Sequence, residues 1–265
     1  MNNTKKKSPI SWVPTAYFAM GLPFVVLNMV TVLMFKGLEV DDKLITFWTS
    51  LILLPWTLKP LWSPFLELFR TKKFFVIVTQ LITGITFGLV AFALNLSHFF
   101  SISIALLAIV AFSGATHDIA CDGVYMSELS NEDQARFIGW QGAFYNIAKI
   151  LATGGLVYLA GYFIELNADA GLLTANKRAW MIILLILSVT MILLGIYHLF
   201  ALPSTQSASS RKTLRSNKEV MKELGQVLMD FFRKTHITYY ICFIILYRFA
   251  EGFVMKIVPL FLKAD

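Results

Sequence analysis

The chain has 265 residues, of which 57% are hydrophobic and 15% are charged, and its formal net charge is +7. Soluble proteins carry about 25% charged residues, so this composition excludes a disordered chain and an ordinary cytosolic enzyme. Cys121 and Cys242 both lie in apolar runs, which excludes a disulfide-stapled secreted domain. An all-α polytopic membrane protein remains, because long uncharged runs lack the alternation of barrel strands.

Seven apolar runs are long enough to cross a bilayer, which takes about 20 helical residues. In chain order they are Trp12–Phe35, Ile45–Leu66, Phe74–Leu96, Phe100–Met126, Phe137–Ile164, Ala179–Ala201 and Ile237–Leu262. Lysine and arginine are concentrated in the connections that share a side with the N-terminus, and such residues favour the cytoplasm. We therefore predict that the N-terminus and the 202–236 loop are cytoplasmic.

The second span contains one lysine, Lys59, within the proline-rich segment Leu54–Pro64. Prolines free backbone carbonyls and bend a helix. Lys59 can bind those carbonyls, line a cavity or reach the headgroups, and the sequence leaves these alternatives open. Trp56 in this segment and Trp140 in the fifth span can stack against a sugar, although a single aromatic residue more often packs in the bundle or faces lipid.

The fourth span contains two carboxylates, Asp118 and Asp122, that lie four residues apart and hence on one helix face. Two neighbouring carboxylates repel each other, which favours a proton bound to one of them. Both are therefore candidates for proton coupling. The alternative is that each aspartate caps a neighbouring helix or pairs with a basic loop residue. Asp122 can also belong to a gate or to an inner ion-pair network.

The fifth span contains Lys149, about 18 Å from the start of its helix and so close to the middle of the bilayer. A lysine at that depth needs a partner or water. Gln141, Tyr145 and Asn146 share its helix face, so we predict that this face lines a substrate cavity. The alternative is a structural pair between Lys149 and an aspartate of the fourth span.

The connection between the sixth and seventh spans is the longest. Residues 219–233 repeat apolar side chains at helical spacing, which predicts either an amphipathic helix on the membrane surface or a solvated linker helix. In the seventh span, Arg248 and Glu251 lie three residues apart. They either neutralise each other or exchange partners and a proton during transport.

This layout divides the chain into a six-helix bundle (1–201), a cytoplasmic loop (202–236) and a seventh helix (237–265). Six spans, a basic loop and a new span are typical of a facilitator-type transporter, in which two six-helix halves enclose the substrate site. We therefore expect the first half and the first helix of the second half of a longer protein. No phosphate-binding loop, metal-ligand spacing or nucleophile motif occurs, which indicates gradient-driven transport without a cofactor rather than an enzyme.

At four places the sequence resembles the muropeptide permease and acetyl-CoA transporter family of the major facilitator superfamily. These are Gly21–Phe24, Lys59–Pro64, Gly114–Gly123 and Tyr247–Glu251. The resemblance implies a twelve-helix inner-membrane symporter that imports peptidoglycan fragments, each an anhydro-disaccharide with a short peptide, driven by protons. It also implies that Lys59, Asp118 and Asp122 occupy the family's characteristic polar positions.

The sequence departs from the family at two places. His117 stands where the family often has glutamine, and the loop after the second span is a degenerate form of the superfamily's acidic-then-basic signature. The resemblance implies a cytoplasmic gate at this loop, formed by Glu67, Arg70, Lys72 and Lys73.

The leading hypothesis is a proton-coupled importer of a polar solute such as a muropeptide. Asp118, Asp122 and Glu251 are its candidate proton-coupling residues, and its candidate cavity residues are Lys59, Trp140, Gln141, Tyr145, Asn146, Lys149 and Arg248. We expect lipid and a small polar substrate as partners, no nucleic acid, no metal, and a monomer. The alternatives are a non-transporting receptor or assembly protein, an inactive truncated transporter and, with less support, a membrane-embedded transferase.

Overall fold

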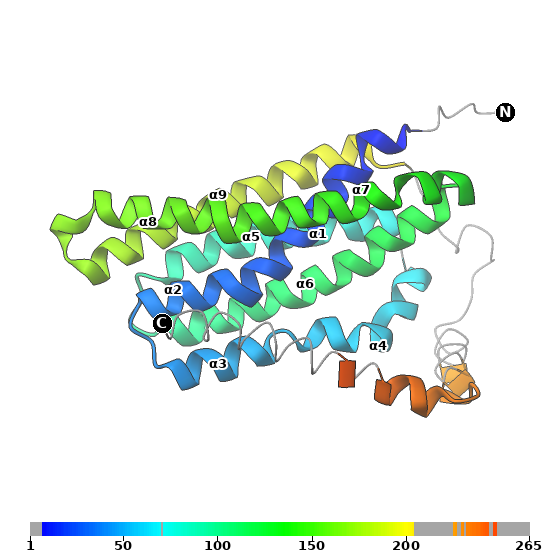
Figure 1. The fold of residues 1–265 in the computed structure, drawn as a ribbon, viewed down its shortest axis with the longest axis horizontal. Coiled ribbons are helices and arrows are strands. Elements are labelled where there is room, and N and C mark those ends of the chain that lie inside the picture. Colours follow the sequence, from blue (N-terminus) through cyan, green and yellow to red (C-terminus); the bar gives the residue numbers. More distant parts are fainter. Residues whose placement is uncertain are drawn as a thin grey trace. The chain divides into compact units, whose positions relative to one another are not determined.

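The computed structural model describes residues 7–69, 71–203, 225–226, 229–230, 232–243 and 246–247, which form helices and turns and no strand. The chain divides into two compact units, Met1–Arg211 and Lys212–Asp265. Figure 1 shows the first unit as a bundle of long helices. In the second unit, residues 237–243 and 246–247 of the predicted seventh span are helical, and the rest of that span lies outside the described residues.

The first unit consists of helices joined by short turns. They are η1 (Pro9–Ser11), α1 (Val13–Val25), η2 (Val26–Val30), α2 (Thr31–Gly37), α3 (Asp42–Leu51), α4 (Leu54–Phe69), α5 (Lys72–Ala93), α6 (Phe99–Glu128), α7 (Asn131–Ile150), η3 (Leu151–Leu156), α8 (Val157–Leu166), η4 (Ala168–Ala170) and α9 (Leu172–Ala201). Here η2 and η3 are π-helical turns inside otherwise continuous helices. Pro23, which has no N–H to donate, precedes η2 and accounts for the first irregularity.

Six helical stretches of the described residues are long and apolar enough to cross a membrane, and they coincide with the first six predicted spans. They are Pro9–Gly37, Asp42–Ser63, Lys72–Ala93, Phe99–Glu128, Asn131–Leu166 and Leu172–Ala201. The prediction of a helical chain with membrane-length helices is thereby confirmed.

The start of the sixth span differs from the prediction. Lys177 and Arg178 were expected in a loop, but they lie inside α9, which begins at Leu172. The apolar run marks only the part of a helix that suits lipid, whereas backbone hydrogen bonding continues through polar residues beyond it. The Lys177 ammonium lies 5.6 Å from the centre of the Phe99 ring, a favourable cation–π contact.

The centre of the bundle is formed by α5, which packs along both α6 and α9, while α1 packs along α7 (Figure 1). Close approach of α5 and α9 depends on small residues. A Cβ atom on Gly84 of α5 would lie 2.9 Å from the carbonyl oxygen of Ser188, and one on Gly195 of α9 would lie 3.0 Å from Leu81. Small residues bring helix backbones together in membranes, and here they bring the polar side chains of α5 and α9 within reach of each other.

Two membrane-length stretches are much less buried than the other four. These are Asp42–Ser63, which contains α3 and most of α4, and Asn131–Leu166, which contains α7 and α8. The helices α3 and α4 lie at the edge of the bundle beside α6 (Figure 1). Large apolar side chains are exposed on both stretches, including Phe47, Leu61, Ile138 and Ile150, so lipid or other helices can cover them.

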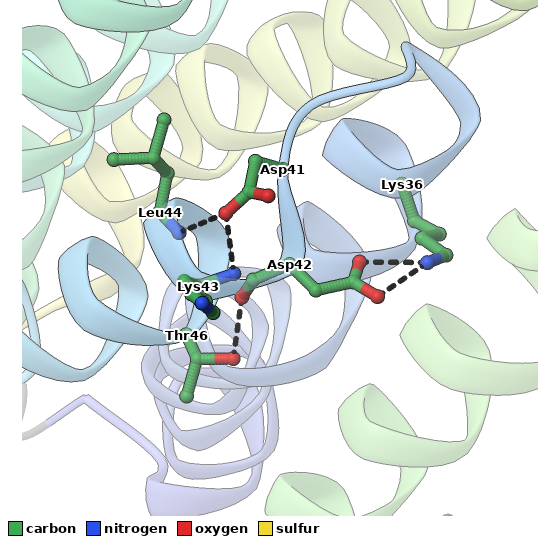
Figure 2. Close-up of polar contacts among 6 residues, drawn as sticks. All are labelled: Lys36, Asp41, Asp42, Lys43, Leu44 and Thr46. Atoms are coloured by element: carbon green, nitrogen blue, oxygen red, sulfur yellow. Dashed lines mark hydrogen bonds and ion pairs between the residues drawn. The ribbon is translucent and has the colours of Figure 1, made fainter.

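The turn from α2 to α3 shows how the ends of these helices are fixed (Figure 2). The Asp41 carboxylate caps α3, since it accepts hydrogen bonds from the backbone N–H groups of Lys43 at 2.9 Å and Leu44 at 3.3 Å. The next residue, Asp42, instead forms an ion pair with Lys36 at 2.6 Å. Both side chains of that pair are more than half exposed to solvent.

These adjacent aspartates provide a matched test. Asp41→Ala removes the helix cap and should lower the free energy of unfolding by about 0.5–2 kcal/mol. Asp41→Asn keeps a capping side chain and should retain most of the wild-type stability. Asp42→Ala breaks a solvent-exposed ion pair and should cost no more than about 1 kcal/mol. Unfolding of the detergent-solubilised chain by heat and by SDS measures both. A loss from Asp41→Asn as large as the loss from Asp41→Ala, or a larger loss from Asp42→Ala than from Asp41→Ala, would contradict the assignment of the cap.

Candidate functional site

A buried ion pair joins α4 to α6. The Lys59 ammonium donates a hydrogen bond to Oδ2 of Asp118 at 2.7 Å, and the indole N–H of Trp56 donates to the same oxygen at 2.9 Å. Trp56 and Lys59 lie three residues apart on α4 and therefore share a helix face. Both donors thus reach one carboxylate oxygen from the same side.

The pair is shielded from solvent on the Asp118 side and partly solvated at Lys59. The side chain of Asp118 is 10% exposed and that of Lys59 is 28% exposed. In such an environment each charge needs the other, because an unpaired charge costs several kcal/mol. The other carboxylate oxygen, Oδ1 of Asp118, is buried and has no hydrogen-bond partner among the described residues. It can therefore accept a hydrogen bond from water or a ligand, or bind a proton.

Gly114, one helical turn before Asp118, provides the space for the Trp56 indole. A Cβ atom at Gly114 would lie 2.8 Å from Cζ2 and 3.0 Å from Cη2 of Trp56. The indole also contacts Phe24 of α1, with the ring centres 5.3 Å apart and the planes at 70°. The indole is thereby held where its N–H points at Asp118.

Asp122 lies one turn beyond Asp118 on α6 but has a different environment. It is exposed, and the hydroxyl of Tyr17 on α1 donates to its Oδ1 at 2.8 Å. The ion pairs Lys36–Asp42 and Lys59–Asp118 do not involve Asp122. The two carboxylates therefore share a helix face, as predicted, yet they have separate partners.

The predicted cavity residues of the fifth span lie on α7, and none of them forms the ion pair with Asp118. Trp140 is 40% exposed and stacks on Phe144, and Asn146 is exposed and donates to the Gly142 carbonyl of its own helix. Gln141, Tyr145 and Lys149 are half-buried.

The alternative prediction for Lys149, a structural pair with an aspartate of the fourth span, is wrong. The structure gives its ammonium no hydrogen bond or ion pair with the described residues, and Lys59 occupies the position beside Asp118 instead. Helical spacing placed Lys149 at the right depth, but it could not reveal which face α7 turns toward α6.

Of the predicted gate residues, Lys72 and Lys73 lie at the end of the bundle where α5 begins and α9 ends. Lys73 donates to the Leu202 carbonyl at 2.9 Å, next to Lys7, which donates to the Phe200 carbonyl at 2.6 Å. Lys72 packs its side chain against Gly123 of α6. Arg70, Arg248 and Glu251 lie outside the described residues, and so does the side chain of Glu67.

A second buried polar system connects four helices, and sequence reasoning missed it. The Thr15 hydroxyl on α1 lies 2.9 Å from Nε2 of His198 on α9, and Nδ1 of that histidine lies 2.9 Å from Oε1 of Gln80 on α5. The Gln80 Nε2 lies 3.0 Å from Nε2 of His117 on α6. The available signal was a glutamine and two histidines inside apolar spans, but their separation in sequence hid the contacts. Here this set is called the histidine–glutamine chain.

Comparison with protein families, curated proteins and solved structures finds no match to this chain. The class of protein is therefore inferred from the helices and polar contacts of the chain itself. The first unit is a helical bundle with six membrane-length helices, a buried ion pair between α4 and α6, and a buried polar chain through α1, α5, α6 and α9. No group of three or more potential metal-ligating side chains occurs among the described residues.

Removing one partner of the ion pair should be costly. Lys59→Met leaves Asp118 without its counter-charge and should lower the free energy of unfolding by about 1–3 kcal/mol, since Lys59 is partly solvated. Asp118→Asn in the same chain should recover part of this loss because it removes the stranded charge. The same substitution at the exposed Lys36 is the control and should cost no more than about 1 kcal/mol. A double variant less stable than Lys59→Met would argue against a coupled pair.

Gly114→Ala tests the position of Trp56. The new methyl group should displace the indole and lower the free energy of unfolding by about 1–3 kcal/mol. Gly139→Ala on α7 is the matched control, because a Cβ atom there meets nothing within 4 Å. An alanine at that helical position should be neutral or stabilising by about 0.5–1 kcal/mol. If the two variants unfold alike, Gly114 is not required for space.

Proposed function

We propose that this protein is a secondary active transporter that couples the import of a polar solute to protons. The observation that carries the proposal is the buried Lys59–Asp118 pair, in which Oδ1 of Asp118 has no hydrogen-bond partner among the described residues. Ionisable groups inside membrane-length helices are expensive, and they commonly mark substrate or proton pathways. A site that held the pair only for packing would be expected to satisfy both carboxylate oxygens.

The coupling follows from charge balance in an apolar interior. When a proton binds Asp118, the aspartate becomes neutral, and the Lys59 ammonium then needs another negative charge. A carboxylate of the incoming solute supplies it. Proton and solute therefore bind together, because either one alone leaves an uncompensated charge. Release of the solute restores the need for the ion pair and so drives the proton off Asp118.

The substrate class rests on the resemblance to the muropeptide permease and acetyl-CoA transporter family. A peptidoglycan fragment carries peptide carboxylates that suit Lys59 and sugar rings that suit the Trp56 indole. The half-buried Lys149 and exposed Trp140 on α7 add a second cation and a second aromatic surface. We assign the protein to an inner membrane with its N-terminus in the cytoplasm, on the distribution of lysine and arginine.

The two sparsely buried stretches, Asp42–Ser63 and Asn131–Leu166, support a major-facilitator arrangement. In that arrangement a second set of helices covers these faces and encloses the solute between two halves. Asp122, Glu251 and Arg248 are further candidates for the coupling path, and Glu67, Arg70, Lys72 and Lys73 are candidates for the cytoplasmic gate.

Asp118→Asn tests the coupling role. Proteoliposomes that contain the protein are given an inward proton gradient by a pH jump, and uptake of a radiolabelled anhydro-disaccharide tetrapeptide is followed. The variant should lose gradient-driven accumulation by at least about tenfold, because asparagine cannot bind and release the proton. The exposed-site variant Asp42→Asn should accumulate the probe normally. Full accumulation by Asp118→Asn would refute the role assigned to Asp118.

The substrate class is tested by ligand-induced stabilisation of the purified protein. A ligand at about 100 times its dissociation constant adds about 2.7 kcal/mol to the free energy of unfolding. Muropeptides should raise the unfolding temperature, and the shift should disappear in Lys59→Met. If only acyl-CoA compounds, only sugars or only peptides stabilise the protein, the stabilising compounds and not muropeptides are its substrate class. Wild-type protein that binds its ligand yet never accumulates it would favour a receptor.

A further inference from the structure

The histidine–glutamine chain is buried as deeply as any part of the bundle. Gln80 and His198 are 0% exposed and His117 is 2% exposed. Each member comes from a different helix, so the contacts depend on the tertiary fold. The geometry of its hydrogen bonds fixes which atoms donate and which accept.

The Gln80 amide assigns opposite roles to the two histidines. Its carbonyl oxygen can only accept, so His198 donates to it from Nδ1; its NH₂ group can only donate, so His117 accepts at Nε2. A neutral His198 then carries its proton on Nδ1 and presents an unprotonated Nε2 to Thr15. A neutral His117 carries its proton on Nδ1, an atom that is buried and has no partner among the described residues.

Thr15 can serve either protonation state of His198. Its hydroxyl lies 2.9 Å from Nε2 of His198 and 3.2 Å from the Trp12 carbonyl of its own helix. With His198 neutral, the hydroxyl donates to Nε2. With His198 doubly protonated, the hydroxyl accepts from Nε2–H and turns its own hydrogen to the Trp12 carbonyl. One hydroxyl rotation therefore keeps every hydrogen bond of His198 intact.

His117 has no such freedom. A proton on its Nε2 would face the NH₂ group of Gln80, so the amide would have to turn over. The turned amide would then present N–H to His198 and force that ring to change its tautomer as well. Charging His117 thus disturbs three side chains, whereas charging His198 disturbs one hydroxyl.

The charged and titratable groups nearest His198 are Lys7 and Lys73, which bind the Phe200 and Leu202 carbonyls, and His117, which is joined to it through Gln80. Tyr197 is its neighbour on α9, with the two ring centres 5.5 Å apart. The other titratable residues in this part of the chain are Tyr17 on α1, Lys59 on α4, Lys72 on α5, and Asp118, Cys121 and Asp122 on α6. Lys59 and Asp118 neutralise each other, and Asp122 is bound by Tyr17. The titratable groups of α2 and α8 belong to the half of the bundle where α9 begins.

Burial opposes a proton at His198, which is 0% exposed, and two electrostatic effects act on that proton as well. Lys7 and Lys73, which bind the Phe200 and Leu202 carbonyls, repel it. The carbonyl end of α9 attracts it, because His198 lies in the last turn of that helix.

We propose that the histidine–glutamine chain is a proton-binding site in which His198 takes up one proton, Thr15 switches from donor to acceptor, and His117 stays neutral. Its ligand is a proton alone. The site is separate from the Lys59–Asp118 pair and does not depend on the proposed transport function, because protonation can be measured without transport.

The experiment is a histidine NMR titration of the full chain in lipid nanodiscs, between about pH 8 and about pH 4, with ¹⁵N- and ¹³C-labelled histidine. Single variants His98→Gln, His117→Gln, His198→Gln and His236→Gln assign the four signals. We expect His198 to convert from the Nδ1–H tautomer to the doubly protonated ring in one step. Over the interval in which His198 charges, His117 should keep its neutral signal. A His198 that stays neutral throughout, or a His117 that charges first, overturns the proposal.

Variants of Thr15 test the switch. Thr15→Val keeps the shape but cannot accept the Nε2–H, so half-protonation of His198 should need at least about a tenfold higher proton concentration. Thr15→Ser keeps the hydroxyl and should stay within about twofold of wild type. Thr190→Val, which removes a hydroxyl on α9 that bonds only to Ile186 of its own helix, is the control. If His198 takes up its proton at the same pH in Thr15→Val as in wild type, the role assigned to Thr15 is wrong. If Thr15→Val fails to fold, the titration of the wild-type protein still tests whether His198 binds a proton.

Discussion

Charged, amide and imidazole side chains inside an apolar bundle need hydrogen-bond partners, and here other helices supply them; this constraint organises the first unit. In the bilayer core no water is available to replace a lost hydrogen bond, so partners come from within the protein. Lys59 and Trp56 of α4 meet Asp118 of α6, while Gln80 of α5 joins His117 of α6 to His198 of α9. The ion pair thus ties the edge helix α4 to the bundle centre, and Gln80 ties α5 to both of its neighbours.

The rotation of an α-helix keeps these two polar systems apart. His117 and Asp118 are consecutive, so their side chains point about 100° apart around α6. His117 therefore faces α5 and Asp118 faces α4. Two separate polar systems therefore occupy adjacent residues of α6 without sharing a hydrogen bond. Each also contains a buried polar atom without a partner among the described residues, Nδ1 of His117 and Oδ1 of Asp118.

Small residues make the polar contacts possible. Gly84 and Gly195 allow α5 and α9 to approach closely, which places Gln80 within hydrogen-bond distance of His198. Gly114 leaves room for the Trp56 indole beside Asp118. Packing between helix backbones and hydrogen bonding between side chains are therefore coupled, and a methyl group added at one of these glycines should disturb both.

The sequence by itself determined that the chain is helical and where its membrane-length helices lie, because hydrophobic runs and helical periodicity are local properties. It also placed Asp118 and Asp122 on one face of α6, since spacing along a helix is local too. Only the tertiary structure decided that Lys59 rather than Lys149 lies beside Asp118, that Tyr17 binds Asp122, and that Gln80 joins two histidines. These partners lie 37 to 118 residues apart in the chain. Which faces meet depends on how α1, α4, α5, α6 and α9 pack against one another, and no local pattern in the sequence records that.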